Sequence, residues 1–139
     1  MTKLTVRKEI EIRFNEVDSM GIVWHGNYAT YFEDAREEFG RKYNLGYLRM
    51  FAEGFYTPLV SLDFSYKHPL IYGDKAIVEI VYIPVEAAKI CYKYKIYSLP
   101  KNTLIATGSS IQVFLDKNYQ LIWNNPDFYI EWKKNNGLT

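Results

Sequence analysis

A single long stretch with helical periodicity constrains what this sequence can fold into more than any other feature. Apolar residues recur every three or four positions from 28 to 43, so a helix there would carry one continuous apolar stripe. The members of this stripe are Tyr28, Tyr31, Phe32, Ala35, Phe39 and Tyr43. Asn27 is expected to cap the first turn, because its side chain can accept a hydrogen bond from an unpaired amide, and Gly46 is expected to stop the helix.

Most of the remaining chain alternates apolar and polar residues, which is typical of strands with one buried face. In the strand 104–115 the apolar positions change parity near Gly108, which predicts a bulge or bend. In the first strand, Phe14 is expected to close the buried face. A short helix is expected from Pro126 to Trp132, followed by a frayed tail. The expected strands cover residues 3–14, 60–67, 76–83, 89–97 and 104–115, with a short extension at 119–123 and the tail at 133–139.

One helix and at least five strands leave a burial problem that limits the architecture. A chain of 139 residues is long enough for one domain with a real core, so a single domain over residues 1–139 is expected. One helix cannot cover both faces of a five-stranded sheet. A sheet that curls around the helix, or that pairs with a second subunit, would bury the remaining apolar surface. The predicted fold class is α+β.

Charge, cysteine content and missing motifs exclude several classes of function. The net charge of +1 argues against a nucleic acid partner, because such proteins usually carry a large basic excess. A single cysteine, Cys91, is interpreted as structural, and two histidines with one cysteine are too few for a conventional zinc site. No G-x-S-x-G, Walker-type or G-x-G-x-x-G motif occurs. No signal peptide or apolar membrane span is evident, so a cytoplasmic protein without a membrane partner is expected.

One loop combines the groups that a small hydrolytic site needs. Asp18 lies in a loop with two glycines, where backbone can approach a ligand closely, and His25 stands just before the predicted helix. The free amides and the dipole of a helix N-terminus favour developing negative charge. A carboxylate that faces this end would form a minimal apparatus for acyl transfer. The alternative is a structural Asp18 that caps a turn or pairs with Arg13 or Arg36.

Motifs in this loop and in the later strands match one known family. The helix-entry motif consists of DSMGIV at residues 18–23, His25, the pair Asn27-Tyr28 and YFEDAR at residues 31–36. A second segment follows, with YKHPL at residues 66–70 and YGD at residues 72–74. Together they closely resemble the hotdog-fold acyl-CoA thioesterases of the 4-hydroxybenzoyl-CoA thioesterase type, and the resemblance spans nearly the full length.

The resemblance implies a curved antiparallel sheet wrapped around the long helix and joined to a second subunit, in a homodimer or homotetramer. It implies hydrolysis of a coenzyme A thioester without a metal or organic cofactor. The aspartate that matches Asp18 would act as general base or nucleophile, an amide at or beside His25 would polarise the thioester carbonyl, and the His25 side chain would assist. The bacterial short-chain branch tends to carry a tyrosine where this sequence has Phe14, so a hydroxyl-dependent role is not expected there.

Other residues are candidates for binding the substrate. Lysines on the strand 89–97 form a basic stripe that could meet the phosphates of coenzyme A, although a solvated strand face explains the stripe equally well. Glu33 and Arg36 are interpreted as surface or interface residues of the helix. The predicted substrate-binding residues are Gly26, Asn27, Tyr28, Lys67, His68, Lys89 and Lys93.

Two other functions stay open on the sequence alone. A hotdog hydratase or dehydratase could act on the same thioesters, but the Asp-x-x-Gly loop favours hydrolysis. A non-catalytic module that binds acyl-CoA or acyl-carrier protein would use the same fold without turnover. The sequence identifies neither the acyl group nor the carrier.

Overall fold

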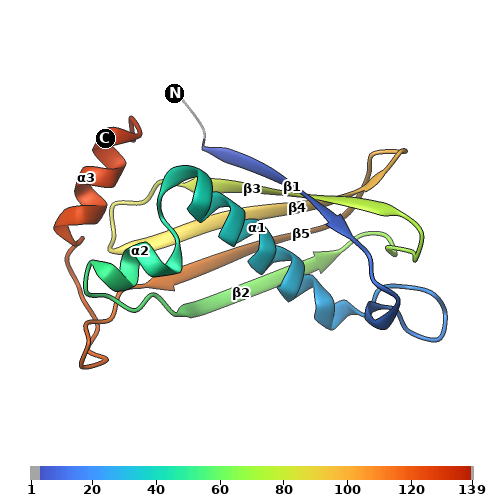
Figure 1. Cartoon of the computed structure of the whole chain (residues 1–139), viewed down its shortest axis with the longest axis horizontal. Coiled ribbons are helices and arrows are strands. Elements are labelled where there is room, and N and C mark those ends of the chain that lie inside the picture. The colour runs from blue at the N-terminus through green and yellow to red at the C-terminus, as the bar shows by residue number, and fades with distance from the viewer. Residues whose placement is uncertain (1–3, 139) are drawn as a thin grey trace.

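The computed structural model describes residues 4–138. Five strands form one antiparallel sheet in the order β1-β3-β4-β5-β2, and the long helix α1 lies across one face of it (Figure 1). The strands are β1 (Thr5–Glu11), β2 (Leu59–Tyr66), β3 (Lys75–Ile83), β4 (Lys89–Leu99) and β5 (Thr103–Val113). The helices are α1 (Tyr28–Tyr43), α2 (Tyr47–Ala52) and α3 (Asp127–Asn135), with short 3-10 turns at Phe14–Glu16 and His25–Asn27. The predicted α+β hotdog architecture is confirmed.

The main core lies between α1 and the sheet. Phe32, Ala35 and Phe39 of the predicted stripe are fully buried, and Tyr28 and Tyr31 are nearly so. Every second residue of β3 and β4 is buried as well, which the alternation predicted for β4, whereas residues 76–83 were predicted only as an apolar strand. Each large apolar side chain taken out of water contributes about 1.5–3 kcal/mol, so this interface accounts for much of the hydrophobic stabilisation.

Both ends of α1 differ in detail from the prediction. Asn27 does precede the helix, but its side chain makes no capping bond and instead donates from Nδ2 to the carbonyl oxygen of Glu16, 2.7 Å away. The capping prediction is wrong because Asn27 ends a 3-10 turn with helical backbone angles, φ −78° and ψ −13°, whereas a capping residue needs an extended backbone. At the other end, Asn44 takes the left-handed conformation with φ 58°, and its amide donates to the carbonyl of Gly40. Gly46 instead precedes α2, a helix that the sequence did not predict.

The irregularity in β5 lies earlier in the strand than predicted. Ile96 pairs with Ala106 whereas Tyr97 pairs with Leu104, so Ile105 is the extra residue in β5. Ile105 and Ala106 are consecutive and both buried, which is the local consequence of this bulge.

Gly108 is needed for close packing rather than for a bulge. A Cβ atom there would lie 2.7 Å from the carbonyl oxygen of Asp63 and closer still to the ring of Phe32. Helix α1 and the β2–β5 pair therefore approach each other too closely at this point for any side chain larger than hydrogen.

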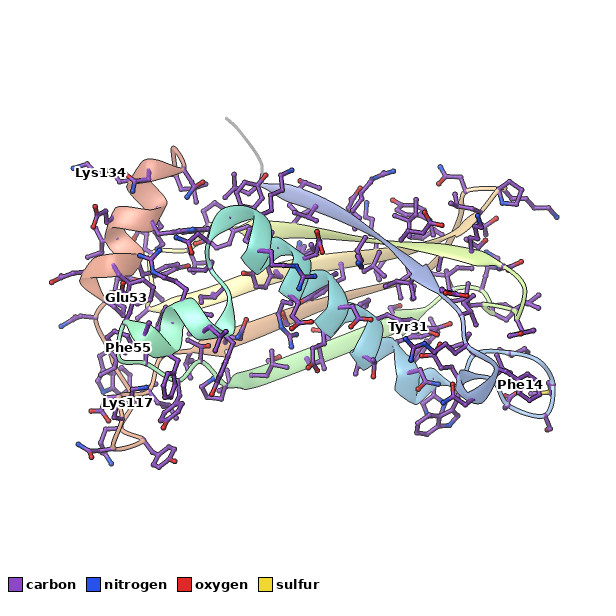
Figure 2. All side chains as sticks on the ribbon, viewed as in Figure 1. Phe14, Tyr31, Glu53, Phe55, Lys117 and Lys134 are labelled. Atoms are coloured by element: carbon purple, nitrogen blue, oxygen red, sulfur yellow. The ribbon has the colours of Figure 1, made fainter. Side chains whose placement is uncertain are left out.

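The first strand is shorter than the predicted range 3–14, and the segment 119–123 forms no strand. β1 ends at Glu11, and Phe14 is 76% exposed on the loop that follows, where Figure 2 labels it. The prediction that Phe14 closes the buried face is wrong because the chain turns away from the sheet before reaching it. Leu121 makes one isolated bridge to Leu115 and belongs to no strand.

The predicted frayed tail is wrong for the residues that the structure describes. Helix α3 continues past Trp132 to Asn135. Lys133 is buried, and its ammonium donates to the carbonyl of Val85 at 2.9 Å. Thr139 lies outside the described residues. Between residues 4 and 138, no helix has the length and apolar character needed to cross a membrane.

Candidate functional site

A pocket of about 340 Å³ opens where β2 ends and the loop before α1 begins. Its walls come from three segments that are far apart in the sequence: the loop of residues 18–25, the first residue of α1, and the end of β2 with the residues after it. The lining residues are Asp18, Ile22, Val23, Trp24, His25, Tyr28, Tyr66, Lys67, His68 and Pro69. The pocket thus collects both predicted catalytic residues and three of the predicted substrate-binding residues.

Asp18 is held in a small hairpin of residues 17–24, closed by a bridge between Val17 and Val23, on the side of this pocket. Its amide donates to the carbonyl of Ile22 at 2.9 Å, and Gly21 at the tip takes φ +74°, which favours glycine. The Val23 amide donates to the carbonyl of Leu70 at 2.8 Å, which fastens the hairpin to the connection between β2 and β3. The position of Asp18 is therefore set by backbone hydrogen bonds.

The two carboxylate oxygens of Asp18 have different surroundings. Oδ1 accepts hydrogen bonds from the amides of Met20 at 2.8 Å and Ile22 at 3.3 Å. Oδ2 has no hydrogen-bond partner among residues 4–138, and within the same range neither Arg13 nor Arg36 forms an ion pair with Asp18. One oxygen thus stabilises the turn, as the structural alternative predicted, and the other makes no hydrogen bond within residues 4–138.

Unpaired backbone amides lie at the start of α1, beside the same pocket. The amide of Asn27 donates to the carbonyl of Trp24 and that of Tyr28 to the carbonyl of His25. The amides of His25 and Gly26 make no hydrogen bond within residues 4–138, as expected for the first positions of a helical turn. They are donors for an oxygen that develops negative charge, and the helix dipole of α1 adds to this preference.

Aromatic side chains form the other walls. The ring of His25 lies 5.0 Å from that of Trp24 and 6.2 Å from that of Tyr66, measured between centroids. The Tyr66 hydroxyl donates to the carbonyl of His25 at 3.4 Å, and its ring packs against Tyr28. A Cβ on Gly26 would overlap the Trp24 ring, so this glycine lets the ring lie over the backbone. Burial raises the pKa of Tyr28, so its hydroxyl stays neutral.

The structure separates the lysine stripe from this pocket. Lys89 and Lys93 are exposed on β4 and point to the outer face of the sheet, because the alternate residues of that strand are the buried ones. Lys89 also lies at the far end of the sheet, where the Tyr129 hydroxyl donates to its carbonyl at 3.0 Å. The basic residues that line the pocket are Lys67, His68 and His25.

Sequence reasoning did not single out Trp24 as a pocket residue. Its 53% exposure beside His25 was not foreseeable, because a Trp in a loop more often packs inward. For Tyr66 and Pro69, the family motif was the only signal in the sequence that pointed to the site. They line the pocket because the pairing of β2 with β5 places the end of β2 beside the loop.

Glu33 and Arg36 line a second cavity of about 480 Å³ between α1, α2 and the sheet. Arg36 donates to the hydroxyl of Tyr94 at 3.4 Å. Cys91 is a free, half-buried thiol whose pKa is raised by burial, which agrees with a structural role. No group of three or more His, Cys, Asp or Glu side chains in the described chain is arranged to hold a metal.

The chain is similar to known thioesterases in sequence and in fold. Residues 12–132 match the model of the thioesterase-like superfamily. A Bacillus subtilis (strain 168) protein named as a candidate acyl-CoA thioesterase is 36% identical over 111 residues, which are 80% of each chain. A chloroplastic acyl-acyl carrier protein thioesterase of Arabidopsis thaliana is 29% identical over 81% of this chain and 59% of its own. The solved DHNA-CoA thioesterase from Staphylococcus aureus is 31% identical, with a TM-score of 0.83 over 96% of this chain and 92% of that chain.

Proposed function

Since the chain belongs to the thioesterase-like superfamily, we propose that it is an acyl-CoA thioesterase that works in the pocket lined by Asp18 and His25. The observation that carries the proposal is that Asp18 and His25 line one pocket. Within residues 4–138, Oδ2 of Asp18 and the amides of His25 and its neighbour Gly26 make no hydrogen bond. Both the Bacillus subtilis and the Staphylococcus aureus relatives carry names of CoA thioesterases, which supports the same substrate class.

The proposed reaction needs no group beyond those of the chain and water. The thioester carbonyl oxygen would accept hydrogen bonds from the amides of His25 and Gly26. Asp18 would take a proton from water, which attacks the carbonyl carbon, or would attack that carbon itself to form an anhydride that water then cleaves. Either path breaks the C–S bond and releases the coenzyme A thiolate and the free acid. The His25 imidazole is exposed at the pocket and would donate to the carbonyl or to the leaving sulfur.

The basic residues of the pocket are the proposed contacts for the carrier. Lys67 and His68 line the pocket, where a lysine ammonium can bind a phosphate of coenzyme A as a point charge and an imidazole N–H can donate to it. Lys89 and Lys93 are given no role at this pocket because they lie on the outer face of β4. Gly26, Asn27 and Tyr28 would shape the junction at which the carbonyl binds.

A thiol-release assay tests the proposed function. Purified protein is incubated with a panel of aliphatic and aromatic acyl-CoAs and acyl-carrier proteins, and released thiol is measured with a chromogenic reagent. Release above the background rate for at least one acyl-CoA is expected. Tight binding without release would favour a binding module, and loss of the acyl double bond or hydroxyl without thiol release would favour a hydratase or dehydratase.

The free edge of β2 supports a proposed homodimer. β2 is the last strand of the sheet order, and Val60 on it is 59% exposed. An exposed apolar edge invites pairing with another strand, and a second copy of β2 would extend the sheet. Replacing Val60 with Lys is expected to shift the mass measured by light scattering from dimer toward monomer. A monomeric wild-type protein would contradict this assembly.

A further inference from the structure

The backbone of Glu16 connects the hairpin of Asp18 with the start of α1. Its carbonyl oxygen accepts a hydrogen bond from the amide of Trp24 at 2.9 Å and another from Nδ2 of Asn27 at 2.7 Å. Trp24 ends the hairpin, and Asn27 immediately precedes the helix. One peptide carbonyl therefore holds both sides of the junction that carries the unpaired amides.

The side chain of Glu16 anchors the same junction in the core. Oε1 accepts hydrogen bonds from the amide of Arg13 at 2.8 Å and from the hydroxyl of Tyr31 at 3.1 Å. Tyr31 is 1% exposed on α1, and Figure 2 shows it at the end of the helix that faces the loop carrying Phe14. Burial and the nearby Glu16 carboxylate raise the pKa of Tyr31, so its hydroxyl stays protonated and continues to donate.

The other attachments of the hairpin lead away from α1. The Val23 amide bonds to Leu70 and the Tyr72 amide to the carbonyl of Gly21, and both partners belong to the connection between β2 and β3. Within residues 4–138, every side-chain hydrogen bond between residues 12–24 and the segment 27–43 involves Glu16. Without the Glu16 carboxylate, the hairpin would keep its attachment to the β2–β3 connection and the Asn27 bond to the backbone carbonyl of residue 16, but it would lose the bond from Tyr31, which lies inside α1.

We propose that Glu16 is a positioning residue that, through Tyr31 and Asn27, sets the distance between the Asp18 carboxylate and the amides of His25 and Gly26. This inference rests on the proposed thioesterase function. Reacting groups must be placed within a fraction of an ångström, because a misplacement of about 1 Å can cost about a hundredfold in rate. In this scheme Glu16 contacts neither the attacking water nor the substrate, and it acts only through the geometry of the Asp18 carboxylate and the amides of His25 and Gly26.

Steady-state kinetics of four variants test the proposal. Glu16→Ala is expected to lower kcat by roughly 10- to 100-fold with KM changed less than about threefold, because the transition state depends on the geometry more than binding does. Glu16→Gln is expected to keep most of kcat, because its amide oxygen can accept both hydrogen bonds. Tyr31→Phe is expected to lower kcat less than Glu16→Ala does. The double variant Glu16→Ala/Tyr31→Phe is expected to match Glu16→Ala alone, because the hydroxyl acts through the carboxylate.

A matched control separates positioning from stability. Tyr129 is a fully buried tyrosine at the opposite end of the sheet, and its hydroxyl bonds to the hydroxyl of Tyr82 and the carbonyl of Lys89. Tyr129→Phe is expected to lower the melting temperature and leave kcat unchanged. Equal kcat losses in Tyr129→Phe and Tyr31→Phe would overturn the proposal, as would a normal kcat in Glu16→Ala.

Hydrogen exchange measured by mass spectrometry gives a readout that does not need activity. The amides of residues 17–27 are expected to exchange faster in Glu16→Ala and in Tyr31→Phe than in wild type, with α2 unchanged. Unchanged exchange in residues 17–27 would show that the Glu16 side chain does not hold the hairpin, and it would overturn the proposal even if the wild-type enzyme is active. A wild-type protein that releases no thiol would instead refute the proposed function, and the exchange result would still decide whether Glu16 holds the hairpin.

Discussion

Asp18→Asn is expected to lower kcat for thioester hydrolysis by roughly a hundredfold to ten-thousandfold, the range associated with loss of a general base. The amide Nδ2 that replaces the unpartnered Oδ2 can neither accept a proton from water nor attack the carbonyl. The amide oxygen can still accept from Met20 and Ile22, so the hairpin should persist. KM is expected to change little, because the amides of His25 and Gly26 and the basic residues of the pocket are untouched.

Asp116 provides a control with nearly the same local structure. Its Oδ1 accepts from the amide of Asn118 at 2.8 Å and from that of Gln120 at 3.0 Å, the same i+2 and i+4 pattern that Asp18 makes. Asp116 lies in the connection between β5 and α3, outside the pocket. Asp116→Asn should leave kcat within twofold of wild type. A small loss in Asp18→Asn, comparable to that in Asp116→Asn, would reduce Asp18 to a turn residue and end the mechanism.

This pair of aspartates also shows how far the sequence could predict the site. A turn-capping role for Asp18 follows from local sequence, and the structure contains it. The pocket beside its second oxygen depends on Tyr66 and His68, which reach it only because β2 pairs with β5 and ends beside the loop. The family motif located both segments, whereas the local pattern alone left the structural alternative open.

The errors in the predicted fold have the same origin. The stripe of α1 and the alternation of β4 are periodic over many residues, and both were confirmed. Asn27 was predicted to cap because capping is a local rule, but the 3-10 turn before α1 gives it helical backbone angles, and its side chain donates to the carbonyl of Glu16 instead. The alternation of buried and exposed residues along β4 predicted that the side chain of Lys93 points away from the core. Its separation from the pocket depends on the order of the strands in the sheet, which local sequence does not give. Short-range patterns determine which way a side chain points, and tertiary pairing determines what it meets.

Phe32→Ala is expected to destabilise the protein by about 3–5 kcal/mol, the usual cost of removing a buried aromatic ring. Phe32 is fully buried on α1, with its ring 4.3 Å from that of Tyr94 and 5.1 Å from that of Phe64, between centroids. The missing ring would leave a cavity between the helix and the sheet. Urea unfolding measures the change, and Phe14→Ala, which truncates a ring that is 76% exposed, should stay within about 0.5 kcal/mol of wild type.

Gly108 allows this contact to be tested from the opposite side. Gly108→Ala would place a methyl group against the Phe32 ring and 2.7 Å from the carbonyl oxygen of Asp63, and overpacking of this kind costs about 1–3 kcal/mol. In Phe32→Ala/Gly108→Ala the new methyl group would occupy part of the emptied space. The double variant should therefore be less destabilised than the sum of the two single variants, with a coupling above about 0.5 kcal/mol. Strict additivity would mean that the Asp63 carbonyl, rather than Phe32, requires glycine at this position, because that clash persists whether or not the ring is present.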